Sequence, residues 1–466
     1  MQGRMIFMPD RYLQSLVCPL PEDIAHLKGA GEFDLALKVI ERRLARKGLP
    51  RMLRQRLETE RMFLMRLPQC YTLKKDDFVA EMRERVPDFQ EEEIDELLLD
   101  GKLDFIYING ERYYHEDTVG SLIKTQQHIS CRALKPYDQQ KEDLNQVIAR
   151  VKAGAKGFRF TVRATVTIAD KAFDKNNIYR VHVPVPADSM QQSGAENISA
   201  SWEINHVDPA DAPQRTAYFE KQMDKNEPLV MEYTYTQRPR YVDPLDESIR
   251  EIVYPAARPV CDDDLAEQPP HIVFTPYMRA LAAELRGEET DPVRIAHKFY
   301  VFATQQVMYA FQRPYLLIEN GSEYAATQLR GDCGLYAVMF ITLCRISGIP
   351  ARWQSGLYAA PGDVGSHDWA EFYSERLGWL PVDCSFGGGA LRAGNEERWQ
   401  FYFGNLDPWR MVANRVYYAP LTPEKKYPRY DPYDSQRAEV ETQYKGLYAG
   451  ERRTSYTITD YREVDE

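Results

Sequence analysis

The sequence predicts an α+β protein, because helical and strand patterns occupy separate parts of the 466-residue chain. Apolar residues recur every three or four positions in the first region, whereas apolar and polar residues alternate in the second. A third region mixes both patterns. We expect a helical N-terminal region at 1–150, a β-sandwich-like domain at 155–250, a mixed core at 265–425 and a polar C-terminal tail at 426–466.

The helical prediction for the N-terminal region rests on apolar spacing. Four apolar residues lie four, three and four positions apart, which places them on one face of a helix: Phe33, Leu37, Ile40 and Leu44. Basic residues are frequent from Arg42 to Arg61. We expect this run to be the solvated face of amphipathic helices, with an anionic partner as the alternative.

Strict alternation of apolar and polar residues predicts the strands of the second region. The clearest case runs from Phe160 to Ile168, and similar patterns cover 179–185 and 231–235. Such strands, half-buried and antiparallel, build a small sheet or sandwich. A polar, proline-bearing stretch at 255–270 is the expected linker to the next region.

Composition excludes several classes of protein. The chain has 59 Lys and Arg against 70 Asp and Glu, a net charge of −11, which argues against a general nucleic-acid binder. No apolar run approaches the roughly 18 residues that span a bilayer. We therefore expect neither a nucleic-acid nor a membrane partner.

The expected compartment is cytoplasmic. The apolar stretch within residues 1–10 is too short for a signal-peptide core, although secretion stays open if a leader has been lost. The seven cysteines form no CxxC pair, so neither a disulfide framework nor a cysteine zinc site is indicated. No cofactor is expected.

Cys333 has a setting that the other six cysteines lack. Glycine and aspartate precede it, Gly334 follows it, and an apolar stripe then runs to the helix stop at 348–350. This pattern places Cys333 at a helix N-terminus, where free backbone N–H groups and the helix dipole favour a thiolate. A free thiol has a pKa of about 8.5 and is mostly protonated near neutrality, so the placement favours a nucleophile.

A nucleophilic cysteine needs a base, and the base needs a group that orients it. The sequence predicts a hairpin with strands at 367–373 and 379–383. If its turn is centred near Glu375, His367 and Asp383 are cross-strand neighbours with Cβ atoms about 5 Å apart. At that distance a carboxylate can hold the imidazole N–H and fix its tautomer.

The neighbours Asp368 and Cys384 are expected on the opposite face of the hairpin, because side chains alternate along a strand. Structural alternatives exist for each residue of the predicted triad. Cys333 could be a small packing residue, and the His367–Asp383 pair a structural hydrogen bond. The order Cys, His, Asp, at separations of 34 and 16 positions, favours catalysis over both, and over a zinc site formed by the three.

Four sequence blocks resemble the core of the transglutaminase-like superfamily: Gly331–Cys333, Gly348–Arg352, His367–Glu371 and Gly378–Asp383. The resemblance implies a papain-like α+β core, and the preceding β-domain is similar to that of bacterial members. It also implies the roles of nucleophile for Cys333, general base and then acid for His367, and orienting group for Asp383. Members include transglutaminases, peptidases and deglycosylating amidases, so the resemblance does not select the substrate.

The chain departs from animal transglutaminases in one respect. Those enzymes place a tryptophan upstream of the cysteine to stabilise the oxyanion, but no tryptophan occurs here between Trp202 and Trp353. We expect the Cys333 backbone N–H to be one donor. The second is expected among Gln306, Tyr309 and Gln312.

The function that these observations predict is cysteine-dependent acyl transfer on amide bonds through a thioester, with hydrolysis of a protein or peptide preferred. Two alternatives stay open: a cross-linking transglutaminase, and a non-catalytic module that binds protein or glycan. The oligomeric state is not indicated. Aromatic residues at 399–418 are expected to pack as core rather than to form a lid over the site.

Overall fold

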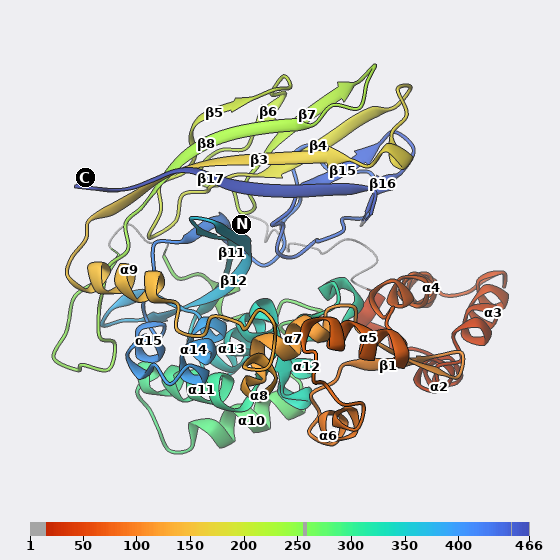
Figure 1. Cartoon of the computed structure of the whole chain (residues 1–466), viewed down its shortest axis with the longest axis horizontal. Coiled ribbons are helices and arrows are strands. Elements are labelled where there is room, and N and C mark those ends of the chain that lie inside the picture. Colours follow the sequence, from red (N-terminus) through yellow and green to blue (C-terminus); the bar gives the residue numbers. More distant parts are fainter. Residues whose placement is uncertain (1–14, 255–258, 449, 466) are drawn as a thin grey trace. The chain divides into compact units, whose positions relative to one another are not determined.

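The computed structural model describes residues 15–254, 259–448 and 450–465 (Figure 1). The chain divides into two compact units. Unit 1 contains 1–139, 269–271 and 307–332, and unit 2 contains 140–268, 272–306 and 333–466. Residues 255–258 of the expected linker, and the segment 1–10 considered as a leader, lie outside the described residues.

Unit 1 is mainly helical. Its helices are η1 (Ser15–Val17), α2 (Glu22–Gly29), α3 (Phe33–Leu44), α4 (Arg51–Cys70), α5 (Lys75–Arg85), α6 (Glu93–Leu99), α7 (Thr118–Thr125), α8 (Gln127–Ser130), η4 (Tyr315–Leu317) and α12 (Gly321–Gln328). Its strands pair as β1 (Phe105–Ile108) with β2 (Glu111–Tyr114), and β9 (Met308–Tyr309) with β10 (Arg330–Gly331). The predicted helix at 33–44 is confirmed as α3. The β1–β2 hairpin was not predicted.

The basic run of unit 1 differs in part from the expected solvated face. Arg43 and Arg61 are partly exposed and form ion pairs with Asp23 and Glu41. Arg56, however, is 1% exposed, and its guanidinium lies 2.8 Å from the carboxylate of Glu60 one helical turn later. A buried guanidinium must be paired, so this arginine belongs to the interior of the unit.

Unit 2 begins with helix α9 (Glu142–Lys152) and carries two antiparallel sheets. One has the order β17-β3-β8-β5, with β17 (Arg452–Val464), β3 (Gly157–Ile168), β8 (Leu229–Gln237) and β5 (Glu196–Ala200). The other has the order β16-β15-β4-β7-β6, with β16 (Gly446–Leu447), β15 (Glu439–Thr442), β4 (Ile178–Pro184), β7 (Thr216–Gln222) and β6 (His206–Val207). Strands β3, β4 and β8 confirm the three predicted strands.

The segment 426–466, expected as a polar C-terminal tail, contains three strands among its described residues. Strands β15 and β16 join the five-stranded sheet, and β17 pairs with β3 from Arg452–Ile168 to Val464–Gly157. The strand was missed because β17 is an edge strand with polar residues on both faces, interrupted by an irregularity between Ile458 and Asp460. Its alternation of apolar and polar residues is therefore weak.

A third sheet in unit 2 has the order β13-β12-β11-β14, with β13 (Gly378–Val382), β12 (Asp363–Ser374), β11 (Ala351–Ala360) and β14 (Arg410–Asn414). The other described helices of unit 2 are η2 (Asp170–Ala172), η3 (Asp262–Asp264), α10 (Pro276–Arg286), α11 (Pro292–Gln306), α13 (Cys333–Ile346), α14 (Cys384–Arg392) and α15 (Glu396–Phe401). Helix α13 packs against β12, with the rings of Phe340 and Phe372 edge to face. Mixed helix and sheet thus agree with the predicted class.

Most of the aromatic residues between 399 and 418 are interior, as expected. Phe401, Tyr402, Phe403, Trp409 and Tyr417 are all buried. In the described part of the chain, no helix combines the length and the apolar character needed to cross a bilayer.

Candidate active site

Cys333 is the first residue of α13, as the sequence predicts. The helix consists mostly of apolar residues and is buried along almost its whole length. It ends before Gly348, whose φ of +78° favours glycine. Cys333 itself is partly exposed. The start of the helix therefore presents the sulfur while the rest of α13 anchors it in the core.

The hairpin that carries His367 and Asp383 forms, but its register differs from the prediction. Ser374 pairs with Gly378, so the turn is centred on Arg376 instead of Glu375. Arg376 fixes this turn because its guanidinium donates to backbone carbonyls of segment 244–249. The centre moves by one residue and the register by two, so every side chain keeps its predicted face.

His367 and Asp383 meet diagonally rather than directly across the hairpin. The last pair of the ladder is Ala370–Val382, and Asp383 follows it as the N-cap residue of α14. Its Oδ2 lies 2.7 Å from His367 Nε2, and its Oδ1 accepts from the backbone N–H of Phe386 at 2.9 Å. The carboxylate thus caps a helix and holds the imidazole at the same time.

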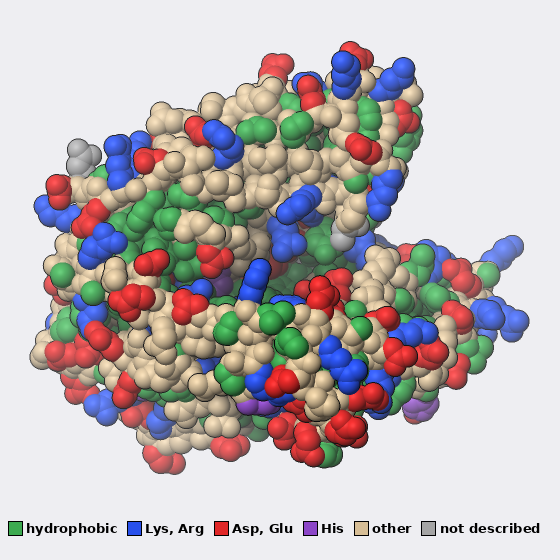
Figure 2. All heavy atoms as spheres, viewed as in Figure 1, with side chains coloured by type: hydrophobic (Ala, Val, Ile, Leu, Met, Phe, Trp, Pro, Cys, Tyr) green, Lys and Arg blue, Asp and Glu red, His purple; other side chains and the backbone are tan. Residues whose placement is uncertain are grey.

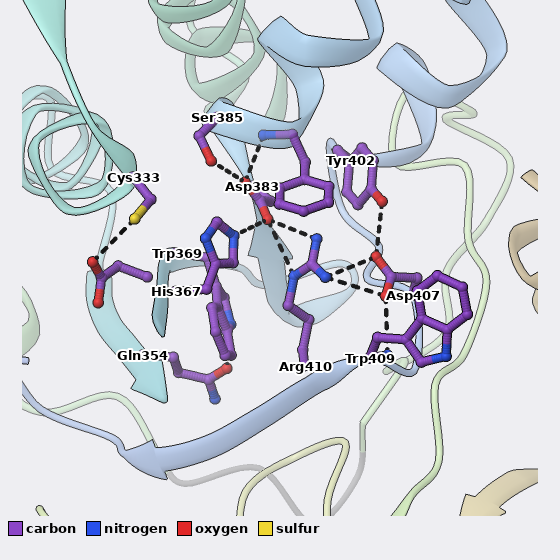
Figure 3. Close-up of polar contacts among 12 residues, drawn as sticks. Cys333, Gln354, His367, Trp369, Asp383, Ser385, Tyr402, Asp407, Trp409 and Arg410 are labelled. Atoms are coloured by element: carbon purple, nitrogen blue, oxygen red, sulfur yellow. Dashed lines mark hydrogen bonds and ion pairs between the residues drawn. The ribbon is translucent and has the colours of Figure 1, made fainter. Parts of the chain in front are cut away.

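Arg410 of β14 completes the surroundings of Asp383 (Figure 3). Its guanidinium lies 3.0 Å from Asp383 Oδ2 and 3.0 Å from Asp407, and the side chains of all three residues are fully buried. Tyr402 donates to Asp407 at 2.8 Å, and the ring of Phe386 lies 4.0 Å from the guanidinium carbon. One buried cation is therefore shared by two buried carboxylates, which gives each of these buried charges an ionic partner.

Sequence reasoning missed Arg410 and Asp407. Their spacing of three, after an aromatic stretch, is too common a pattern to indicate an ion pair, and the partner Asp383 lies 27 positions earlier. Only the pairing of β14 with β11 brings Arg410 next to the hairpin.

The electrostatic balance at Asp383 favours the carboxylate. Burial opposes ionisation, but the charges of His367 and Arg410, with the hydrogen bonds from His367 and Phe386, outweigh it and hold the pKa of Asp383 well below its ordinary value. An anionic Asp383 stabilises an imidazolium on His367, which is the state that forms when a base takes a proton from a thiol.

Asp368 is a second carboxylate at the site, and the sequence did not predict its role. It is 2% exposed, and Cys333 Sγ donates to its Oδ2 at 3.3 Å. The side-chain amide of Gln436 donates both to the other oxygen of Asp368 and to the backbone carbonyl of His367, the latter at 2.9 Å. Asp368 and His367 are neighbours on β12 and therefore point to opposite faces of the strand, as predicted. The face that carries Asp368 packs against α13.

The imidazole lies between the sulfur of Cys333 and the carboxylate of Asp383 in the view of Figure 3. Its Nε2 is engaged by Asp383, so Nδ1 is the nitrogen left to act on the thiol. The structure thus joins the predicted residues as two hydrogen-bonded pairs, Cys333 with Asp368 and His367 with Asp383. Proton transfer between sulfur and imidazole stays a prediction.

The hairpin and α14 are held by close packing. Trp369 Nε1 donates to Gln354 at 2.6 Å, which fixes the ring that stacks beside His367. Gly387 in α14 has no room for a side chain, since a Cβ there would collide with the hydroxyl of Tyr300 in α11. The glycine at this position therefore allows α14 and α11 to approach each other closely.

The three residues expected to include the second oxyanion donor have different surroundings. Gln306 is exposed at the end of α11, Tyr309 is buried in β9 beneath the ammonium of Lys124, and the Gln312 amide donates to the carbonyl of Ala310 at 3.1 Å. Part of the donor capacity of Gln312 is therefore already used. The identity of the donor stays a prediction.

Comparison with known proteins bears directly on this site. Residues 279–384 match the family described as the transglutaminase-like superfamily, and the match includes Cys333, His367 and Asp383. This segment belongs to that superfamily. A protein-glutamine gamma-glutamyltransferase of Pseudomonas aeruginosa is 27% identical over 122 residues, which cover 24% of this chain and 18% of that protein. The chain therefore matches less than a fifth of that relative's length.

Two solved structures are similar in part. A protein from Cytophaga hutchinsonii, described as a candidate cysteine protease, overlays with a TM-score of 0.43 and 15% identity over 67% of this chain and 92% of that one. The periplasmic domain of TgpA from Pseudomonas aeruginosa overlays with a TM-score of 0.27 and 16% identity over 56% of this chain and 96% of that one.

Proposed function

We propose that this transglutaminase-like protein is a cysteine-dependent acyl-transfer enzyme that hydrolyses amide bonds in a protein or peptide. The observation that carries the proposal is the buried His367–Asp383 couple at 2.7 Å, together with a cysteine at the start of α13. A buried imidazole with an anionic carboxylate on one nitrogen is arranged to accept a proton on the other.

In the proposed first step the Cys333 thiol gives its proton to His367 and the sulfur attacks the amide carbonyl carbon. The C–N bond then breaks, His367 returns the proton to the departing amine, and a thioester remains. In the second step His367 takes a proton from water, the hydroxide attacks the thioester, and the acid leaves while the sulfur recovers its proton. Asp383 keeps the imidazole oriented and stabilises its cationic form in both steps.

Hydrolysis is preferred to cross-linking because cross-linking requires a site that excludes water and admits an amine. Cys333 is partly exposed, which leaves water access to a thioester formed on its sulfur. No residue pattern in the sequence indicates a channel for a second, amine-bearing substrate.

The proposal is tested with a library of glutamine-bearing and ordinary peptides, incubated with the wild-type protein and with Cys333→Ala. We expect cleavage or deamidation by the wild type and none by the variant, with a thioester trapped by acid quench and identified by mass spectrometry. Incorporation of dansyl-cadaverine that outpaces hydrolysis would replace hydrolysis by cross-linking. No turnover in either protein, with Cys333 alkylated by iodoacetamide no faster than a free thiol, would contradict the enzyme.

A further inference from the structure

A cavity of about 480 Å³ in unit 2 lies next to the catalytic strand. Residues of the edge strand β17, the start of β12 and the segment 430–437 line it. Figure 2 shows basic side chains gathered along a hollow on this face, beneath the strands at the end of the chain. The proposed hydrolysis assigns no role to this cavity.

The lining of the cavity is cationic. It includes Arg437, Arg452 and Arg453, and no aspartate or glutamate is among the lining residues that the structure describes. This is unusual for a chain with a net charge of −11. A cavity walled by charges of one sign concentrates ligands of the opposite sign.

Arg452 also has donors that no group of the protein satisfies. Its Nε and Nη2 are buried and have no hydrogen-bond partner within the described protein. The nearby carboxylate of Glu439 is already held by Lys425 at 2.7 Å and by the backbone N–H of Asp431 at 2.9 Å. Buried guanidinium donors are costly without an acceptor, so the arrangement calls for a ligand that accepts hydrogen bonds.

The cavity wall is joined to the proposed catalytic residues. Ser366, a lining residue, immediately precedes His367 on β12. Arg437 follows Gln436, whose amide donates to the His367 carbonyl and to Asp368. Tyr456, in the opposite wall, donates to the Gln436 carbonyl at 2.9 Å. The Cα atoms of Ser366 and His367 are consecutive, about 3.8 Å apart, so the cavity wall is continuous with the strand that carries the imidazole.

We propose that this cavity binds a carboxylate of an extended peptide substrate and so selects acidic peptides. The inference rests on the proposed function for its catalytic consequence. Arginine pairs with carboxylates through two parallel hydrogen bonds, which gives orientation as well as affinity. Strand β17 is the edge of its sheet, and such an edge can align an extended chain through main-chain hydrogen bonds.

The first test measures binding without turnover, using the full-length Cys333→Ala protein and fluorescence polarisation. The probes are two amidated, fluorescein-labelled peptides, Gly-Glu-Glu-Gln-Gly-Gly and its counterpart with both glutamates replaced by glutamine. We expect the acidic probe to bind about tenfold more tightly, and the difference to shrink as salt is added. A third probe, the glutamine peptide with a free C-terminus, distinguishes a terminal carboxylate from a side-chain carboxylate. Equal binding of all three probes would overturn the proposal.

The second test changes the cavity. Arg437 and Arg453 are exposed, so Arg437→Glu and Arg453→Glu are expected to keep the fold, which circular dichroism checks. In each variant the roughly tenfold tighter binding of the acidic probe is expected to be lost. A lysine-bearing probe is expected to bind each variant more tightly than it binds the parent protein. The matched control is Arg462→Glu, an exposed arginine on the same strand but outside the cavity lining. Loss of preference in the control as well, or in none of the variants, would overturn the proposal.

The two proposals fail separately. If the protein hydrolyses peptides but kcat/KM is the same for acidic and neutral peptides, the proposed role of the cavity is wrong and the proposed hydrolysis is supported. If no peptide is cleaved but the arginine variants lose selective binding, the cavity stands and the proposed hydrolysis is wrong.

Discussion

Two carboxylates, Asp383 and Asp368, lie at the same site in opposite electrostatic settings. Asp383 accepts from an imidazole and from the guanidinium of Arg410, and its side chain is fully buried. Asp368 accepts from a thiol, at 3.3 Å, and from the carboxamide of Gln436. The first is stabilised by positive charge, whereas these two donors to the second are neutral.

The difference assigns the two groups different tasks. A carboxylate beside an imidazole favours the imidazolium, so Asp383 promotes proton transfer to His367. A carboxylate beside a thiol disfavours the thiolate, so Asp368 opposes loss of that same proton from Cys333. In the proposed mechanism, Asp383 therefore favours uptake of a proton by His367, whereas Asp368 disfavours loss of the proton from Cys333.

The largest expected effect comes from removing the orienting group. Asp383→Ala leaves the imidazole without a partner on Nε2, so kcat should fall by about 10³-fold or more, with a small change in KM. Steady-state kinetics on the best library peptide measures it. A fall of less than tenfold, in a variant with a normal circular dichroism spectrum, would contradict the role of Asp383.

Replacement of Arg410, the cation that Asp383 and Asp407 share, tests the setting of Asp383 through the stability of the protein. Arg410→Leu leaves Asp383 and Asp407 buried without their cation, and the free energy of unfolding should fall by about 3–5 kcal/mol at pH 7. Because the folded pKa of Asp383 is depressed, its stabilising contribution is present above the ordinary carboxyl pKa of about 3.9 and is lost as the pH falls toward the folded value. The gap between wild type and variant should therefore narrow below about pH 4 in urea denaturation. Arg462→Leu is the control and should change little.

Asp368→Asn tests the restraint on the nucleophile. Replacing the anion by a neutral amide should move the pH midpoint of Cys333 alkylation by iodoacetamide down by about one unit, equivalent to about 1.4 kcal/mol. The sign is fixed, because a lost negative charge can only ease loss of the thiol proton. A midpoint that stays in place or moves up would show that Asp368 does not restrain the sulfur.

The smallest effect is expected at Gln436. Gln436→Leu removes the donors that hold Asp368 and the His367 carbonyl, at a cost of about 1 kcal/mol in unfolding free energy. The Cys333 alkylation midpoint should shift less than in Asp368→Asn. A larger shift than in Asp368→Asn would mean that Gln436, and not the carboxylate, sets the state of the thiol.

The sequence predicted the parts of this site that are encoded locally. A glycine-flanked cysteine before an apolar stripe identified the start of α13, and two short strand-like segments around a turn identified the hairpin with His367 and Asp383 on one face. The error in register arose because the turn was assumed to be centred near Glu375, whereas Ser374 pairs with Gly378 and places the centre on Arg376. A shift of two positions leaves the faces unchanged, which is why the contact survived the error.

The parts that the sequence did not predict depend on pairings between distant segments. Arg410 reaches Asp383 only through the β11–β14 ladder, and Gln436 reaches Asp368 from a stretch in which no element was expected. Strand β17 has too few apolar residues to be distinguished from a loop. Local periodicity carries no information about such partners.

The pairing of β17 with β3 also sets an order of events during synthesis. Arg452 pairs with Ile168, which precedes it by 284 positions, so one side of β3 stays unpaired until residues 452–464 have been made, whereas β8 can pair with its other side much earlier. Gln436 and the arginines of the cavity emerge after the cysteine and the histidine as well. A nascent chain would thus carry the Cys333 thiol before the cavity arginines are made, and the proposed selection of peptides would require synthesis through β17.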